Sequence, residues 1–245
     1  MTDRIGHVFM QKTRPQELQP SAQSQGVPQP PLELPYPTNS TLIHLPEPEE
    51  AQVSAMTLRT AIEKRRTLRR YQEQTLSAEE LSYLLWCTQG VKEITSRPST
   101  LRTVPSAGAR HPFETYVLAN RVETLTPGLY RYVAMQHSLL ETNLSLQIVD
   151  EITHACFDQE MVRRSAVTFI WVAVVERMAW RYGERGYRYM HLDAGHVCQN
   201  LYLAAENIDC GVCAIAAFDD DNLNAVLGLD GENLFAIYLG SVGKR

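Results

Sequence analysis

Two short segments of the sequence combine residue types that suit a charged, flat ligand. The first, "KRRTLRRY" at residues 64–71, places five cations in seven positions with a threonine among them. Guanidinium groups and a hydroxyl at the end of a helix suit a phosphate dianion, although a solvated basic helix end has the same pattern. The sequence contains neither a Walker loop nor a G-x-G-x-x-G motif, so side chains would have to hold the phosphate.

The second segment, "TVPSAGARHPFETY" at residues 103–116, is stiff and small where it leads into a strand. Pro105 and Pro112 restrict its backbone, and residues 106–109 are small enough for a flat ring to approach main-chain N–H groups. Small residues in a turn also serve tight packing, so that alternative stays open. We interpret His111 as a contact near the ligand, with a hydrogen bond that stabilises the turn as the alternative.

A third segment, "IAAFD" at residues 215–219, has the same small character. Ala216 and Ala217 lie between a strand-like stretch and a helix that Asp219 would cap. Such a strand end also suits a flat ligand, with tight packing again as the alternative.

The elements around these segments follow from periodicity and capping signals. A helix is expected in "SAMTLRTAIEKRR", with Ser54 as N-cap and Leu58 and Ile62 on one face. Ser77 and Glu80 have the spacing of a capping box and begin a second helix, which ends at the next glycine. A third helix is expected over residues 193–208.

Strands are expected between and after these helices. Residues 166–175 are apolar on both faces, which indicates a fully buried strand. Helices and strands are mixed without strict alternation, and this favours an α+β fold over a doubly wound sheet. The expected strands are 113–119, 129–133, 166–175, 212–218 and 234–243.

Composition limits the class of protein. The 245 residues are 44% hydrophobic and carry 23 basic and 28 acidic side chains, so no global positive field favours nucleic acid. The longest apolar run is half of the roughly 20 residues that a membrane helix needs, and the N-terminus lacks a signal-peptide pattern. These features predict a soluble, cytoplasmic protein with no membrane partner, whose five cysteines are reduced thiols.

The first 50 residues differ from the rest, because they hold nine of the 13 prolines. This composition disfavours helix and offers little apolar surface. We expect residues 1–50 to form an extended, proline-rich arm and residues 51–245 to form the folded domain. Leu42, Ile43 and Leu45 indicate that the later part of the arm lies along a partner surface.

Seven segments together resemble the nitroreductase superfamily and, within it, the SagB-type dehydrogenases. They are "RRTLRRY", "LSYLLWCTQG", "PSAGARHPFETYVL", "PGLYRY", "RYGERGYRYMHLDAGHVCQNLYLAAE", "AIAAFDDD" and "IYLGSVGK". The likeness covers residues 35–245. It implies a nitroreductase-like fold with a central, mostly antiparallel sheet flanked by helices. It also implies an intertwined homodimer that holds each FMN in a cleft built by both subunits.

The resemblance further implies roles for individual residues. Contacts to the FMN phosphate and ribityl chain are implied for Arg65, Arg66, Thr67, Arg69 and Lys244. A loop that lies against the flavin of the other subunit is implied for Pro105, Ser106, Ala107 and Gly108. The strand-end backbone near the flavin N5 edge matches Ala216 and Ala217.

The sequence departs from the family pattern at Arg181 and Tyr182. Related azoline oxidases carry a lysine-tyrosine pair there that serves proton abstraction, whereas an arginine stays protonated and is a poor general base. We assign catalytic roles to Tyr182, as a proton donor or relay, and to Arg181 beside it. Residues 187–189 either line the substrate mouth or pack one subunit on the other.

Metal binding is not expected. His191 and His196 lie five residues apart, so on a helix they point about 140° from each other, and no third ligand has a useful spacing. We interpret Asp193 as a helix cap and His196 as a residue near the helix start. The C-x-x-C pair, Cys210 and Cys213, lacks a second pair and is interpreted as packing.

The sequence therefore predicts an FMN-dependent oxidoreductase of the nitroreductase type. Hydride would pass through the flavin in two half-reactions, to or from a small organic substrate, with NADH or NADPH as a candidate electron donor. One alternative is an azoline dehydrogenase that tailors ribosomal peptides within a partner complex. Another is a flavin-binding module without turnover.

Overall fold

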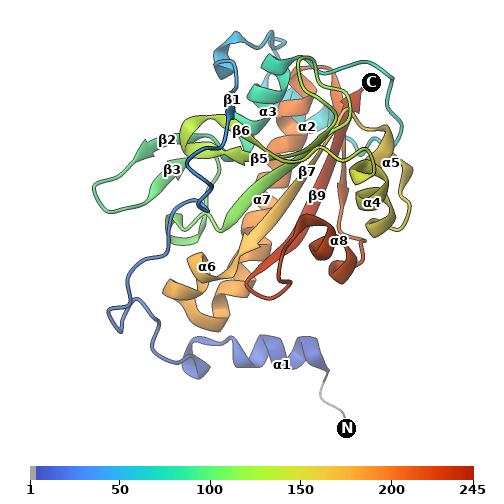
Figure 1. Ribbon diagram of the computed structural model, residues 1–245. Coiled ribbons are helices and arrows are strands. Elements are labelled where there is room, and N and C mark those ends of the chain that lie inside the picture. The colour runs from blue at the N-terminus through green and yellow to red at the C-terminus, as the bar shows by residue number, and fades with distance from the viewer. Residues whose placement is uncertain (1–3) are drawn as a thin grey trace.

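A seven-stranded sheet forms the centre of the protein in the computed structural model, which describes residues 4–245 (Figure 1). The strand order is β1-β6-β5-β4-β7-β9-β8, and every neighbouring pair is antiparallel. This confirms the predicted α+β class with its mostly antiparallel sheet. The strands are β1 Leu42–His44, β4 Phe113–Ala119, β5 Gly128–Val133, β6 Ser138–Asn143, β7 Val167–Val174, β8 Cys210–Ile215 and β9 Leu234–Lys244.

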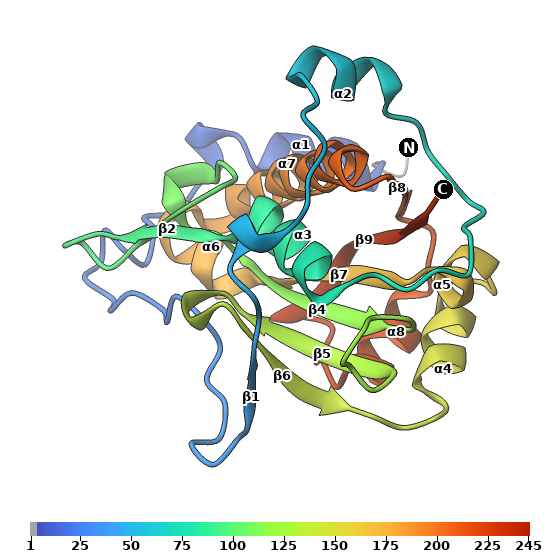
Figure 2. The same cartoon turned by 90° about the horizontal axis from the view of Figure 1, so that it is seen from above.

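Helices cover both faces of this sheet. In Figure 2, α3 and α7 lie on one side of the strands, and α4, α5 and α8 lie on the other. None of the helices described is long and apolar enough to cross a membrane. Their bounds are α1 Ile5–Lys12, α2 Leu58–Lys64, α3 Ala78–Gln89, α4 Ile148–Ala155, α5 Glu160–Arg164, α6 Val175–Tyr182, α7 Gly186–Asn207 and α8 Asp220–Leu227.

A short hairpin extends away from this body. It pairs β2, Val91–Ile94, with β3, Thr100–Arg102, and projects from the side of the molecule in Figure 1. β3 leads directly into the stiff 103–112 segment and then into β4. The hairpin therefore sets the point from which that segment enters the sheet.

The strand β7 shows how the sheet holds the two layers together. Phe169 and Trp171 pack into the cluster under α3 and α7, whereas Ile170 and Val172 pack into the cluster under α4 and α8. Successive side chains of a strand point to opposite faces, so a strand between two layers must be apolar throughout. All four side chains are fully buried, which confirms the expectation for this segment.

Capping residues in the sequence correctly predicted the starts of two helices. The Ser77 Oγ accepts from the amide of Glu80 at 3.2 Å, and the Glu80 carboxylate accepts from the amide of Ser77 at 3.1 Å. Asp219 caps α8 by accepting from the amide of Asn222 at 3.0 Å. Both capping predictions are confirmed.

Two other helix starts were wrong. Thr57, not Ser54, caps α2, because its hydroxyl accepts from the amide of Thr60, whereas the Ser54 amide donates to the carbonyl of Asn207. α7 begins at Gly186, soon after a turn at Gly183 with φ 52° ends α6. Asp193 and His196 therefore lie well inside α7, and neither caps it nor marks its start.

Residues 4–50 run along the body in an irregular path, with the helix α1 ahead of the first proline. Arg185 donates to the carbonyl of Thr13 at 2.9 Å, and the Arg188 guanidinium lies 5.8 Å from the centroid of the Phe9 ring. Farther along, β1 joins the edge of the main sheet by pairing with β6. The division of the chain at residue 50 stays a prediction.

Candidate functional site

The basic segment after α2 runs in an extended path across the edge strand β8 and the end of β9. The amide of Leu68 donates to the carbonyl of Val212 at 2.9 Å, and the amide of Gln72 donates to the carbonyl of Lys244 at 3.0 Å. A Cβ at Gly211 would lie 2.4 Å from a side-chain carbon of Leu68. The glycine therefore permits the close approach that seats this segment.

Tyr202, on α7, joins the basic segment to the far end of β8. The guanidinium of Arg65 lies 5.1 Å from the centroid of its ring, within range of a cation–π contact. Its hydroxyl lies 3.1 Å from the Thr67 hydroxyl and accepts from the amide of Ala214 at 3.0 Å. The structure thus brings the basic segment close to the strand end that leads to Ala216 and Ala217, both of which are exposed.

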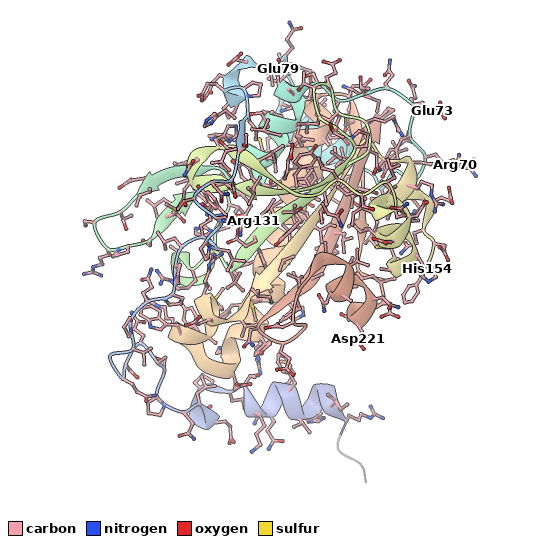
Figure 3. The ribbon with its side chains drawn as sticks, in the orientation of Figure 1. Arg70, Glu73, Glu79, Arg131, His154 and Asp221 are labelled. Atoms are coloured by element: carbon pink, nitrogen blue, oxygen red, sulfur yellow. The ribbon has the colours of Figure 1, made fainter. Side chains whose placement is uncertain are left out.

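Three arginines of this segment remain open to solvent. Arg66, Arg69 and Arg70 are exposed, and Figure 3 shows Arg70 at the outer edge of the molecule. Within residues 4–245, no arginine of the segment forms an ion pair with a carboxylate. Their charge is therefore available to an external anion.

Lys244 does not join these arginines through its ammonium group. Its Nζ pairs with the carboxylate of Glu80 and donates to the carbonyl of Ile208 at 3.0 Å. Both partners are internal to the chain and direct the amine toward α3. Only the main chain of Lys244 contacts the segment, through Gln72.

The loop of residues 105–111 has an unusual backbone. Gly108, Ala109 and His111 have φ values of 59°, 52° and 44°, a region that residues with a Cβ rarely adopt. The Ser106 hydroxyl accepts from the amide of His111 at 2.9 Å, which closes the loop on itself. Clustered strain of this kind is maintained only by surrounding structure and is common at ligand sites.

Asp193 is part of the surrounding structure that holds the loop. Its Oδ1 accepts from the amide of Ala107 at 3.3 Å, while its Oδ2 is buried without a hydrogen-bond partner. Burial raises the pKa of this carboxyl, and hydrogen bonds from Ser106 and Ala107 partly oppose that rise. Sequence reasoning missed this role, because nothing local pairs Asp193 with a loop 86 residues away.

Arg181 and Tyr182 lie against the same loop. A Cβ at Gly108 would lie 2.5 Å from the Tyr182 hydroxyl and 3.1 Å from the side chain of Arg181. Tyr182 also packs edge-on against Tyr189, with ring centroids 4.8 Å apart. The structure therefore brings the two predicted catalytic residues to the loop and not to the basic segment.

The loop and the basic segment contact α7 at different positions along its axis. Asp193 holds the loop and Tyr202 holds the basic segment, nine residues apart in one helix. At about 1.5 Å per residue, the two contacts are about 14 Å apart along its axis. Within one chain, the predicted cofactor residues form two separate groups.

The histidines of the region differ in environment. Burial, with the nearby Arg102, lowers the pKa of His111 to about 3, so its imidazole is neutral. His191 and His196 are exposed on α7, and His196 lies 4.0 Å from Asp193. The described part of the chain holds no group of three metal-ligating side chains.

The cysteines are structural residues, although Cys213 lies in β8 beside the basic segment. All five are free thiols, and Cys210 and Cys213 are buried within β8. Their burial in the core supports the packing interpretation.

Comparisons with known proteins identify the family. Residues 62–244 match the sequence profile of the nitroreductase family. A protein of Methanocaldococcus jannaschii, provisionally named a nitroreductase, is 33% identical over 203 residues, which are 83% of this chain and 96% of that protein. The trifolitoxin-processing protein TfxB of Rhizobium leguminosarum is 29% identical over 155 residues, 61% of this chain and 41% of its own.

Solved structures agree with this assignment. A nitroreductase-like protein of Anabaena variabilis superposes with a TM-score of 0.63 at 29% identity, over 77% of this chain and 38% of that one. A Desulfovibrio desulfuricans structure in complex with FMN has a TM-score of 0.54 at 19% identity, over 78% and 88%. The E. coli microcin synthetase McbBCD complex has a TM-score of 0.63 at 17% identity, over 100% and 83%.

Proposed function

We propose a function from the premise that this chain belongs to the nitroreductase family: it is an FMN-dependent oxidoreductase that acts as a homodimer. Bound flavin would supply hydride transfer in two half-reactions, to or from a small organic substrate. The observation that carries the proposal is the row of exposed arginines without ion pairs, which Tyr202 links to the end of β8. The FMN complex of a structural neighbour supports the choice of cofactor.

The residues of the basic segment fit the phosphate end of FMN. Arg66 and Arg69 are exposed and form no ion pair with any carboxylate of residues 4–245, and free guanidinium groups bind phosphate through charge-assisted hydrogen bonds. Arg65 is held against Tyr202, and we assign the Thr67 hydroxyl, 3.1 Å from the Tyr202 hydroxyl, to a contact with a ribityl hydroxyl. Lys244 is a weaker candidate, because its ammonium already pairs with Glu80.

The small residues fit the flat ring. Ala216 and Ala217 are exposed after β8, so their main chain is accessible to a ring edge. We assign residues 105–108 to the site of the second subunit, as the resemblance to the family implies; within one chain the loop contacts α7 about 14 Å from Tyr202 along the helix axis. The exposed face of α2 supports a dimer, since Leu58 and Ile62 are 67% and 54% exposed in the single chain.

Tyr182 is the residue that we assign to proton handling. Its hydroxyl lies at the loop beside Gly108 and can hold or donate a proton there. Arg181 stays cationic next to it, with its guanidinium 5.7 Å from the centroid of the Tyr182 ring. Arg181 would therefore orient or stabilise an anionic group and would not abstract a proton.

The test of this function uses the purified full-length chain. The expected result is a yellow protein that releases FMN on denaturation, is reduced by NADH or NADPH without oxygen, and is reoxidised by a nitroaromatic or quinone acceptor. Stopped-flow absorbance would follow both half-reactions. A flavin that binds but is never reduced by these or stronger donors would contradict an enzymatic role.

A second function has specific support. The likeness to TfxB and to a subunit of the microcin synthetase complex favours oxidation of azoline rings in a processed peptide. Arg181 stands against it, because the related oxidases have a lysine there to take the proton. The discriminating assay supplies a thiazoline peptide and oxygen to the yellow protein and measures, by mass spectrometry, the loss of two hydrogens.

A further inference from the structure

A cavity of about 430 Å³ lies beside the strained loop, between it and the β2–β3 hairpin. Its polar lining is basic, with Lys92 and Arg102, and no carboxylate lines it. Leu101, Val104 and Pro105 supply an apolar wall. The combination suits a ligand with an anionic head and an apolar body.

Arg102 is the central residue of this cavity. The residue is only 6% exposed, and its guanidinium donates to the Thr100 hydroxyl at 3.2 Å and to the Gln89 side-chain oxygen at 2.9 Å. Its remaining nitrogen, Nη2, has no hydrogen-bond partner among residues 4–245. Burial lowers the pKa of Arg102 to about 10, which leaves it protonated at neutral pH.

The charges around Arg102 do not balance. Four buried arginines, at 102, 110, 131 and 177, share the region with two carboxylates, Glu33 and Glu114. Glu114 pairs with Arg177, lies 4.0 Å from Arg131, and accepts from the amide of Leu34. Glu33 accepts from the amide of Met135 at 3.2 Å. Among residues 4–245, neither carboxylate forms a hydrogen bond or ion pair with Arg102, so the region keeps an excess of positive charge.

No other nearby group removes this excess. The imidazole of His111 is neutral and adds no charge. Burial, together with Glu114, raises the pKa of Glu33. Arg131 lies where the N-terminal arm crosses the sheet, and its guanidinium donates to the carbonyl of Leu34 (Figure 3). An uncompensated buried charge is costly, and an anion that enters the cavity would offset it.

We propose that this cavity binds the carboxylate of a small organic acid, with Arg102 as its buried partner and Lys92 at its rim. A guanidinium matches the planar geometry of a carboxylate, and the negative charge of the carboxylate would offset the charge of Arg102. The apolar wall then contacts the body of the acid. As a binding site this stands without flavin chemistry; the further step, that the acid is a substrate, rests on the proposed function.

The binding test uses benzoate and its neutral amide, benzamide, titrated into the full-length protein by calorimetry. Benzoate is expected to bind about tenfold more tightly, because only its head carries a negative charge that pairs with the guanidinium. Lys92→Gln removes an exposed rim charge without disturbing the buried cluster, and it should weaken benzoate binding several-fold. Arg97→Gln, in the turn of the same hairpin but outside the cavity, is the control and should leave benzoate binding unchanged.

Each result of these titrations either supports or overturns the proposed carboxylate site. Equal affinity for benzoate and benzamide, no saturable benzoate binding, or equal effects of the two variants would each overturn the site. The proposed function is judged separately: benzoate binding by a protein that retains no FMN would sustain the cavity and refute the flavin role. If flavin cycles, a lower KM for para-nitrobenzoate than for para-nitrobenzamide, lost in Lys92→Gln, would identify the acid as a substrate.

Discussion

The basic segment and the loop of residues 105–111 would contact the same cofactor, yet they are built in opposite ways. The basic segment presents exposed arginines without ion pairs on an extended backbone. The loop presents small residues on a backbone with three positive φ values, fixed by the buried Asp193. The basic segment would therefore contribute charge to FMN binding, and the loop would contribute a rigid surface for the flat ring.

This difference predicts how each region responds to substitution. Exposed charges contribute to binding but little to stability, because the free protein keeps them solvated. A strained loop contributes to both binding and stability, because its conformation depends on each contact that holds it. Four variants test the contrast.

The largest effect is expected at the arginines. Replacing both Arg66 and Arg69 by alanine should reduce FMN affinity by about 3 kcal/mol or more, since each charge-assisted contact contributes about 1.5 to 3 kcal/mol. The free energy of unfolding of the apoprotein should change by less than about 0.5 kcal/mol. Fluorescence titration with FMN and urea denaturation measure the two quantities. Unchanged FMN affinity would remove the phosphate assignment.

Gly108→Ala tests the loop. The new Cβ would occupy a left-handed position and lie 2.5 Å from the Tyr182 hydroxyl, so we expect a loss of about 1 to 3 kcal/mol in stability. Gly228→Ala is the matched control, because Gly228 has φ 70° but no atom within 4 Å of its Cβ position. It should cost about 1 kcal/mol from backbone strain alone. Equal losses in the two variants would show that the loop is not tightly held against Tyr182.

Tyr202→Phe sharpens the link between the basic segment and β8. The ring that contacts Arg65 stays, whereas the hydroxyl contacts to Thr67 and to the amide of Ala214 are lost. FMN affinity should fall by about 1 kcal/mol, the contribution of one net hydrogen bond. Tyr83→Phe is the control: it removes a tyrosine hydroxyl on α3 that accepts from Asn207, and it should leave FMN affinity unchanged.

The smallest effect is expected in the pH dependence of stability. Burial raises the pKa of Asp193 in the folded state above its ordinary value near 3.8. The folded protein then holds this proton more tightly than the unfolded chain, so stability falls as pH rises through the folded pKa. Asp193→Asn should flatten that fall in urea denaturation measured above pH 3.8. A fall of the same size in the variant would assign it to another group.

The sequence predicted the parts of the fold that depend on neighbours in the chain. β4 and β7 followed from their apolar patterns, and the caps at Ser77 and Asp219 followed from hydrogen bonds that span three residues. The start of α7 was missed, because polar and aromatic residues from Tyr187 onward give no clear stripe. The elements β6, α4, α5 and α6 were not predicted, since their short segments fold through packing on the sheet.

The residues of the candidate site also divide into those that the sequence predicted and those that it did not. The arginine segment and the loop were found because composition alone marks them. Tyr202, Asp193 and Arg102 were missed, because each acts through a contact with a residue distant in sequence or through burial. Lys244 was included on resemblance, and its pairing with Glu80 could not be read from the sequence.

The central claim is that one FMN site takes its arginines from one subunit and its loop from the other. Co-expression of the Arg66→Ala, Arg69→Ala chain with the Gly108→Ala chain, each with a different tag, tests it most directly. With random pairing, half of the dimers are mixed and each has one intact site, so the mixture should regain about a quarter of the wild-type flavin sites and their activity. A mixture that retains no more flavin and activity than its two parents would contradict the claim.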